Sequence, residues 1–384
     1  MSRILWHSCV PWANSGYGIQ TALWTRELRK MGHEVCISAF WGLHGSATAW
    51  EGIPVLPGFG GNYCSPSLQQ HARHVRPDLV VTLGDVWVLD PGVLRDLPAA
   101  HWLPCDCRPM SAADRGVAEA GGAELVAMSR FGQQRFRDAG FTSALYVPHA
   151  VDFSVFRPAE DRGKLREAAG IGPGTFVIGV NAANNDAIRK APAEMLLAFA
   201  KFTASRPDSL LFLHTGVHCD GGQDLECIAE NLGITDRVKV ADQYRYSAGL
   251  FSQEDMAGWY GMLDVLCAAT YGEGFGIPIV EAMACGVPAI TTRCSSMEEL
   301  NPDGLQVGGL PFWNGVHRAW WIRPDSGELA RAFEQAYERR GDVDRVRLRE
   351  SVQRYDVPVV AEEHMKPAIG ALLERMAARR PAAA

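Results

Sequence analysis

The chain contains 384 residues, of which 47% are hydrophobic and 21% are charged. A chain of this composition buries a substantial core, so the disordered, collagen-like and coiled-coil classes are excluded, and the length suits two domains of ordinary size. Residues 1–150 contain 12 basic and 12 acidic side chains, so the remaining residues carry the whole formal charge of −7. The sequence has no basic tail or stripe, which argues against strong nonspecific binding to nucleic acid.

The ten cysteines are spaced irregularly, and the one tight pair, Cys105 and Cys107, lacks the second pair that a zinc ribbon needs. We therefore expect buried free thiols, no disulfide framework and no bound metal. The N-terminus has no apolar signal-peptide core, and no run of about 18 apolar residues occurs in the sequence. These features predict a soluble, cytoplasmic protein without a transmembrane segment, and they leave its oligomeric state open.

Strand-like and helix-like segments alternate through the first half of the chain. A buried strand is expected over 3–9, followed by a turn-rich loop, an amphipathic helix with Trp24 and Leu28 on its apolar face, and a second strand over 34–40. A helix over 129–139 and four further strands follow, the strands at 79–83, 101–105, 124–128 and 144–147. This alternation favours a parallel, doubly wound sheet.

A charged segment rich in glycine and proline interrupts the alternation at about 151–174. The second series then has expected strands at 176–180, 209–214, 238–240, 265–268 and 287–291, with helices at 193–204, 254–262 and 278–284 and mostly helical sequence after 327. The sequence thus predicts an α/β fold of two Rossmann-like domains, residues 1–155 and 156–350, followed by a C-terminal helical segment, 351–384.

The loop after the first strand contains Gly16 and Gly18 at the start of a helix, with Tyr17 between them. It is not a dinucleotide fingerprint, because Thr21 occupies the third glycine position and no acidic residue ends the next strand. Glycine-rich backbone at a helix N-terminus still binds anionic groups. A plain tight turn is the alternative interpretation.

The most specific motif lies between Tyr271 and Pro288 and has the sequence YGEGFGIPIVEAMACGVP. Gly274 and Gly276 leave the backbone open to a ligand, and a proline follows where a helix should begin. The loop is therefore expected to present backbone N–H groups and the positive end of a helix dipole, with Glu273 and Glu281 on either side. From spacing alone, the two glutamates are equally well explained as a surface residue and a residue that complements the dipole.

This motif resembles the E-x7-E signature of the retaining glycosyltransferases of family 4, which have the GT-B fold of two Rossmann domains with parallel sheets facing across an interdomain cleft. The resemblance implies that Glu281 binds the ribose hydroxyls of a nucleotide-sugar and that Glu273 lies beside the donor sugar as a catalytic residue. It also implies that the backbone of Gly274, Phe275, Gly276 and Ile277 faces the sugar and the diphosphate.

Other segments agree with the resemblance. The segment 146–158 is similar to the family's interdomain segment, and Arg189 and Lys190 are similar to the basic pair that clamps the diphosphate, with Lys190 at the better-matching position. Arginine and lysine suit phosphate oxygens as a fork and a point charge. Tyr244 falls where the family reads the nucleobase, and core packing is its alternative role. The C-terminal helix is similar to the element that returns to the first domain, and capping the second domain is the alternative.

The sequence departs from the family where relatives carry a histidine near the anomeric centre. The run from His101 to Asp106 ends in aspartate, so we expect Asp106 to be the polar catalytic residue beside the reacting carbon. Asp85 and Trp12 are candidates for contact with the acceptor, and seven of the eleven tryptophans lie in this half. Capping of a helix or turn is the alternative for each aspartate.

The resemblance therefore implies a retaining glycosyltransferase that moves a sugar from a nucleoside-diphosphate sugar to an acceptor hydroxyl by a front-face mechanism, with no metal and no other cofactor. Gly16, Tyr17 and Gly18 are assigned with the second-domain motif to donor binding. A sugar-nucleotide epimerase and a noncatalytic sugar-nucleotide binder are the alternatives. The donor sugar stays undetermined, and so does the acceptor, whether glycan, small molecule or modified nucleobase.

Overall fold

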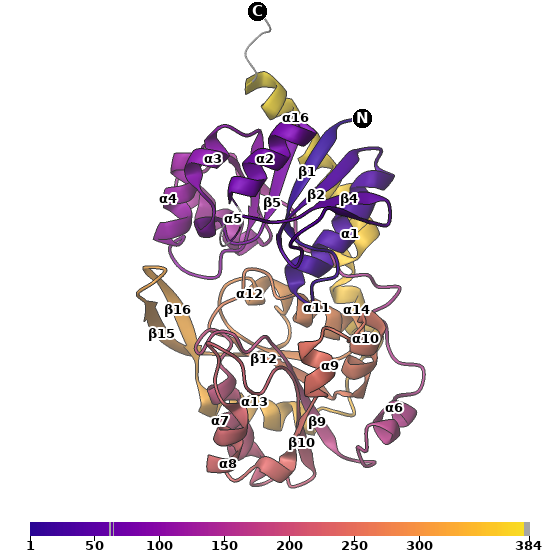
Figure 1. Ribbon diagram of the computed structural model, residues 1–384. Helices are drawn as coiled ribbons and strands as arrows, with labels where there is room; N and C mark the ends of the chain where they lie inside the picture. The colour runs from indigo at the N-terminus through magenta and orange to yellow at the C-terminus, as the bar shows by residue number, and fades with distance from the viewer. Residues whose placement is uncertain (61–62, 64, 380–384) are drawn as a thin grey trace, which may run out of the picture. The chain divides into compact units, whose positions relative to one another are not determined.

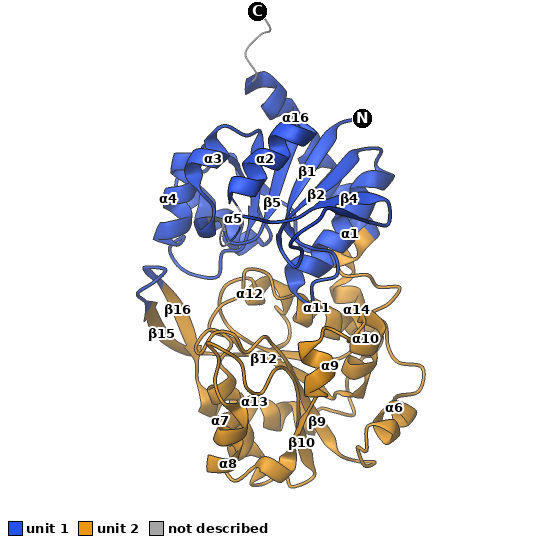
Figure 2. Cartoon of the chain, in the orientation of Figure 1, with its two compact units in different colours: residues 1–150, 314–319, 358–384 blue, residues 151–313, 320–357 orange. Residues whose placement is uncertain are grey.

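The structure is a computed structural model that describes residues 1–60, 63 and 65–379. The chain divides into two compact units, coloured separately in Figure 2. The first unit comprises 1–150, 314–319 and 358–384, and the second comprises 151–313 and 320–357. None of the described helices has the length and apolar character needed to cross a membrane.

The chain passes from the first unit to the second between residues 150 and 151 and returns between 357 and 358. The sequence predicted the domain boundaries after 155 and after 350. The difference has a local cause, because the two linking segments are hydrogen-bonded to each other. The N–H of Val151 donates to the carbonyl of Tyr355, and the N–H of Phe153 donates to a carboxylate oxygen of Asp356. Both segments are thereby held in the second unit.

The first unit is built on a sheet whose described strands lie in the order β3-β4-β2-β1-β5-β6-β7-β8. Figure 1 labels four of them, β4, β2, β1 and β5. Its neighbouring strands are parallel except for the β3–β4 pair. The strands are β1 (Arg3–Cys9), β2 (Glu34–Trp41), β3 (Thr48–Trp50), β4 (Ile53–Leu56), β5 (Leu79–Leu83), β6 (Ala99–Leu103), β7 (Glu124–Ala127) and β8 (Leu145–Tyr146).

Helices cover both faces of this sheet. On one face Trp24 of α1 packs edge-on against Trp102 of β6, and Arg375 of α16 forms an ion pair with Glu124 of β7. On the other face, side chains from α2 to α5 join one hydrophobic cluster with β1, β5 and β6. The helices are α1 (Gly16–Lys30), α2 (Ser65–Val75), α3 (Pro91–Arg95), α4 (Ala112–Gly121), α5 (Arg130–Asp138) and α16 (Lys366–Arg379), with a 3₁₀ turn, η2 (Val86–Val88), after β5.

The second unit contains a parallel sheet with the described strand order β11-β10-β9-β12-β13-β14. Its strands are β9 (Phe176–Asn181), β10 (Ser209–His214), β11 (Val238–Val240), β12 (Val265–Ala268), β13 (Ala289–Thr292) and β14 (Leu305–Val307). Its helices are α6 (Arg162–Ala168), α7 (Pro192–Thr203), α8 (Leu225–Asn231), α9 (Gln243–Ser247), α10 (Gln253–Met262), α11 (Ile277–Ala284), α12 (Met297–Leu300), α13 (Ser326–Glu338) and α14 (Arg345–Ser351). Two short helical segments, α15 (Val357–Val360) and the π-helical turn Ala361–Met365, lead to α16.

Aromatic packing fixes the helices on the two faces of this second sheet. Phe176 of β9 packs against Phe202 of α7, and Phe202 packs against Phe333 of α13. On the opposite face, Gly179 leaves room for Leu263 and Trp259 at the end of α10, where a Cβ would lie 2.2 Å from a Leu263 methyl group. The sheet is therefore covered on both sides, as its continuous apolar strands require.

The predicted strand 101–105 is wrong by two residues, since β6 is Ala99–Leu103. The alanines at 99 and 100 have no strong strand preference, but both are buried and pair with Val80 and Val81 of β5. The hairpin of β15 (Gly309–Asn314) and β16 (Ala319–Pro324) was not predicted, and neither were β3 and β4. β3 and β15 are mostly exposed, and β4 and β16 mix buried and exposed residues, so none of them has the apolar run of a buried strand.

A buried ion cluster ties α6 to the second sheet. Asp264, whose side chain is 9% exposed, accepts hydrogen bonds from Arg162 at 2.5 Å, from Arg166 at 2.7 Å and from the N–H of Val177 at 2.7 Å. Removing one partner of such a cluster leaves buried charges uncompensated, which costs about 3–5 kcal/mol.

We expect Asp264→Ala to lower the thermal midpoint of the second unit by roughly 6 °C or more, a shift consistent with that cost for a unit of this size. Scanning calorimetry measures it. Glu119→Ala is the matched control, because the Arg115–Glu119 pair is half exposed and is worth less than about 1 kcal/mol. Equal shifts for the two variants would contradict the role of Asp264.

Candidate functional site

The candidate site of the second unit lies where its strand order reverses. The chain builds outward from β9 through β10 to β11, then returns to β12 on the other side of β9. In open α/β sheets the loops that diverge at such a point leave a crevice at the carboxyl ends of the strands, and ligands bind there. The loop after β9 carries Arg189 and Lys190, and the loop after β12 carries Glu273. Sheet topology therefore brings these three residues to one place.

Two cations converge on one carboxylate in this site. The Lys190 ammonium lies 2.6 Å from Oε1 of Glu273, and Nη1 of Arg189 lies 3.4 Å from Oε2. Arg189 also donates to the carbonyl of Gly272 at 3.4 Å, and its own carbonyl accepts the N–H of Tyr271 at 2.8 Å. The two loops are thus joined by backbone and side-chain contacts, and Asp186, 4.0 Å from Arg189, adds a second carboxylate beside the two cations.

The side chain of Glu273 stays ionised although it is buried. Only 13% of its side chain is exposed, and burial alone would raise its pKa, but Lys190 and Arg189 outweigh burial and hold the pKa below its ordinary value. Two serines fix its backbone: Ser295 accepts its N–H, and the Ser296 hydroxyl donates to its carbonyl at 2.8 Å. The carboxylate is therefore positioned as well as charged.

The loop that carries Glu273 leads into helix α11 at Gly276. This residue has a φ of 105°, and a Cβ there would lie 2.9 Å from a carbon of Ile279, so glycine is required. Gly276 caps the helix without a side-chain hydrogen bond, and Pro278 occupies the first turn. Phe275 is buried against Tyr355, and its carbonyl accepts the Ser296 hydroxyl. Backbone N–H groups in the first turn of such a helix favour anions.

Glu281 lies one turn into α11 and is 5% exposed. Its Oε2 accepts the hydroxyl of Tyr260 at 2.7 Å, that hydroxyl accepts the side-chain amide of Asn181 at 2.7 Å, and Asn181 contacts His214 at 3.1 Å. Burial raises the pKa of Glu281 to about 7, and the Tyr260 hydrogen bond offsets only part of this effect. A buried carboxyl that titrates near neutrality is a feature of functional sites.

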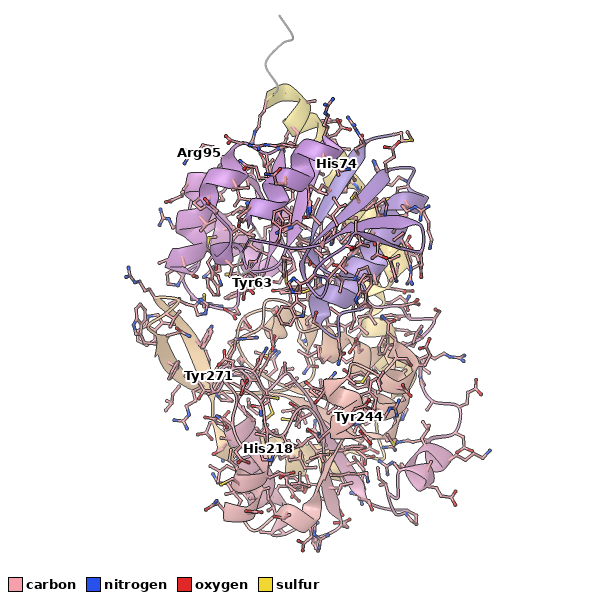
Figure 3. All side chains as sticks on the ribbon, in the orientation of Figure 1. Tyr63, His74, Arg95, His218, Tyr244 and Tyr271 are labelled. Atoms are coloured by element: carbon pink, nitrogen blue, oxygen red, sulfur yellow. The ribbon has the colours of Figure 1, made fainter. Side chains whose placement is uncertain are left out.

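Tyr244 lies on α9 and is 77% exposed, so the alternative of core packing is wrong (Figure 3). The helix itself is anchored by its neighbour Gln243, whose amide donates to the carbonyl of Thr215 and accepts the N–H of Val217. The ring therefore stands in solvent on a fixed helix that follows β11.

The first unit has its own reversal of strand order, between β1 and β5. The loop after β1 carries Trp12, the first turn of α1 carries Gly16, Tyr17 and Gly18, and the loop after β5 carries Asp85. The Tyr17 hydroxyl lies 3.5 Å from Oδ2 of Asp85. Ser15 caps α1 by accepting the N–H of Gly18, where a Cβ would lie 2.2 Å from the carbonyl oxygen of Ala13. Gly18 is thus explained by close backbone approach, while Trp12 is 47% exposed.

Asp106 lies in the loop after β6, close to two other aspartates. Burial raises the pKa of Asp114 to about 7, and the carboxylates of Asp85 and Asp106 add to the effect. The Asp114 side chain also accepts the N–H of Trp87 at 3.3 Å. Asp85 and Asp106 are therefore close enough for their charges to act on Asp114, and we call these three residues the aspartate group.

The sequence placed His101 at the start of its strand, and that assignment is wrong. His101 is in the middle of β6 and is fully buried, with Nδ1 2.6 Å from the hydroxyl of Thr82. Burial lowers its pKa to about 3, so the ring is neutral. It is a residue of the sheet interior.

Four residues of the second-unit site were not identified from the sequence: Asn181, Tyr260, Ser295 and Ser296. Asn181 had a usable signal, because it is a polar residue directly after the predicted strand 176–180, where parallel strands present ligand-binding groups. The serines and Tyr260 come from distant segments, and their contacts with the two glutamates arise only on folding.

The fold and its topology define an α/β protein of the GT-B class, and comparison with known proteins agrees. Residues 184–339 match the family model described as glycosyl transferases group 1, and this segment contains Lys190, Glu273 and Glu281. Anabaena HepE in complex with UDP-glucose has 17% sequence identity and a TM-score of 0.73, covering 97% of this chain and 100% of its own. That likeness is evidence for the fold.

Two curated relatives match part of this chain. A MMP α-(1→4)-mannosyltransferase of Mycolicibacterium hassiacum is 34% identical over 159 residues, covering 41% of this chain and 33% of its own. A D-inositol 3-phosphate glycosyltransferase of Arthrobacter is 29% identical over 203 residues, covering 51% of this chain and 46% of its own. The chain therefore spans less than half the length of each of these relatives.

Proposed function

We propose that the chain is a retaining glycosyltransferase that moves a sugar from a nucleoside-diphosphate sugar to an acceptor hydroxyl without a metal. The observation that carries the proposal is the convergence of Lys190 and Arg189 on Glu273 at the strand-order reversal, beside the N-terminus of α11. This arrangement suits a diphosphate, and it lies in the segment that matches group 1 glycosyltransferases.

The site has to stabilise the negative charge that develops on the leaving diphosphate. As the bond between the anomeric carbon and the phosphate oxygen breaks, negative charge grows on the diphosphate, where Lys190, Arg189 and the first turn of α11 stabilise it. Cations and helix N–H groups thereby supply the stabilisation that a divalent metal supplies in other transferases. Glu273 keeps the lysine ammonium in position and faces the donor sugar.

Retention follows when the acceptor attacks from the same side that the diphosphate leaves. The acceptor oxygen bonds to the anomeric carbon, and its proton passes to the departing phosphate oxygen. The protein then contributes mainly positioning and electrostatic stabilisation. Glu281 accepts the ribose hydroxyls and Tyr244 stacks on the base. In the first unit, Asp106 lies beside the reacting carbon, Gly16, Tyr17 and Gly18 assist donor binding, and Asp85 and Trp12 contact the acceptor.

The test is a panel of nucleotide sugars that includes UDP-glucose, the ligand of HepE, and a mannosyl donor, because one relative is named a mannosyltransferase. Calorimetry should show binding that persists after treatment with EDTA. With an accepted acceptor, proton NMR should show a product with the same anomeric configuration as the donor. An inverted product, loss of turnover with EDTA, or an epimerised donor that forms without acceptor would each contradict the proposal.

A further inference from the structure

Three aromatic side chains form a continuous, partly exposed surface in the first unit, which we call the aromatic surface: Phe40, Tyr63 and Trp87. The rings of Phe40 and Tyr63 have centroids 5.8 Å apart, and those of Tyr63 and Trp87 are 6.5 Å apart. Tyr63 is 41% exposed and Trp87 is 44% exposed. Figure 3 labels Tyr63 at the edge of the first unit.

The aromatic surface adjoins the strand-order reversal of the first sheet. Phe40 lies near the end of β2, and Trp87 lies in the 3₁₀ turn after β5. A Cβ on Gly84 would lie 3.4 Å from the Phe40 ring and 3.9 Å from the Tyr17 ring, so these two rings flank the backbone that leads into Asp85. The Tyr17 hydroxyl in turn reaches the Asp85 carboxylate.

The aspartate group borders the same surface. Trp87 donates its backbone N–H to Asp114, and Asp114 is close enough to Asp85 and Asp106 for their charges to act on it. The cations nearest in sequence have other contacts: the Arg108 guanidinium lies 5.0 Å from the Phe131 ring, and Arg115 forms an ion pair with Glu119.

Aromatic rings beside carboxylates suit one class of ligand. The apolar faces of a sugar ring pack against aromatic rings, and sugar hydroxyls donate hydrogen bonds to carboxylate oxygens. A phosphate or carboxylate placed next to these aspartates would be repelled. The negative charge and the exposed rings thus complement a neutral, hydroxyl-rich ring.

We infer that the aromatic surface and the aspartate group bind an unphosphorylated sugar ring as the acceptor and reject its phosphorylated counterpart. This inference rests on the proposed transferase function, and it names the substrate class that function leaves open. It also separates this chain from the relative whose name specifies an inositol phosphate.

The experiment is saturation-transfer NMR on the whole protein with matched pairs of sugars at millimolar concentration: mannose with mannose 6-phosphate, glucose with glucose 6-phosphate, and inositol with inositol phosphate. We expect signals from the neutral members, reduced at least fivefold in Trp87→Ala and restored in Trp87→Phe. Asp85→Asn should improve the relative binding of the phosphorylated members by roughly threefold to tenfold, the size expected for removal of one nearby charge at a protein surface. Asp96→Asn, an exposed aspartate at the end of α3, is the control that should change neither.

Three outcomes would overturn the inference: stronger binding of the phosphorylated members, neutral-sugar signals that Trp87→Ala leaves intact, or no neutral-sugar signal at all. A dimer in sedimentation analysis that Trp87→Ala dissociates would assign the aromatic surface to a second copy of the chain instead. Nucleotide-sugar binding, measured by calorimetry on the same preparations, separates this inference from the proposed function. If the unaltered protein does not bind a nucleotide-sugar, the proposed function is contradicted. If it binds the nucleotide-sugar but not the neutral sugars, only the inference about the acceptor is contradicted.

Discussion

Replacement of Lys190 by alanine is expected to lower kcat/KM by about 10² to 10³-fold, the effect of removing one preorganised charge-stabilising donor. The ammonium lies 2.6 Å from Glu273, and we propose that it stabilises the diphosphate as the glycosidic bond breaks. Without it, Glu273 keeps the longer contact with Arg189 at 3.4 Å and its hydrogen bond with Thr270, and the group loses one positive charge. Steady-state rates of nucleoside-diphosphate release measure the loss.

The buried ion pair makes a stability control necessary, because Lys190→Ala also removes the closest cation from a buried carboxylate. The double variant Lys190→Ala, Glu273→Gln removes both charges and should recover the thermal midpoint without recovering activity. Lys201→Ala on α7, where the lysine bonds to the Ser326 hydroxyl, should retain full activity. A folded Lys190→Ala protein with less than a fivefold loss would show that the lysine does not contact the leaving group.

Donor affinity is expected to fall about fivefold between pH 8 and pH 6, because the pKa of Glu281 is about 7. Above this pKa, Glu281 is a carboxylate that accepts hydrogen bonds from ribose hydroxyls. Below it, the protonated group loses acceptor strength, so affinity is present at high pH and lost as the pH falls. Fractions ionised of roughly 0.9 at pH 8 and 0.1 at pH 6 follow from that single pKa. Calorimetric titration with a nucleotide-sugar measures the change.

Glu281→Gln provides the matching control, since the amide is similar in shape and does not titrate. We expect weaker binding by about tenfold at pH 8, in line with the loss of a charge-assisted hydrogen bond, and a flat profile from pH 6 to pH 8. If the variant kept the wild-type slope, another group would be responsible for the pH dependence. If it bound as tightly as the wild type at pH 8, the ribose role of Glu281 would be wrong.

Some properties of Glu273 and Glu281 could be predicted from the sequence and others could not. Their spacing and the surrounding glycines indicated a ligand-binding loop before a helix, and the structure has that loop, with Gly276 in a backbone conformation that favours glycine. Their different ionisation was not predictable. Glu273 has two cations from a loop more than eighty residues away, while the Glu281 carboxylate accepts the hydroxyl of Tyr260. Such contacts depend on which strands become neighbours, and residue spacing does not encode that.

The sequence by itself determined the local architecture: most strands and helices, because apolar periodicity and capping residues act over a few positions, and two domains, because the apolar content and length support two cores. The tertiary structure decided which residues share a site. It buried His101 inside β6, put Tyr244 in solvent, and gathered Asp85, Asp106 and Asp114 beside exposed rings. The physical reason is that burial and long-range contact set charge and accessibility, and both follow from strand order rather than from position along the chain.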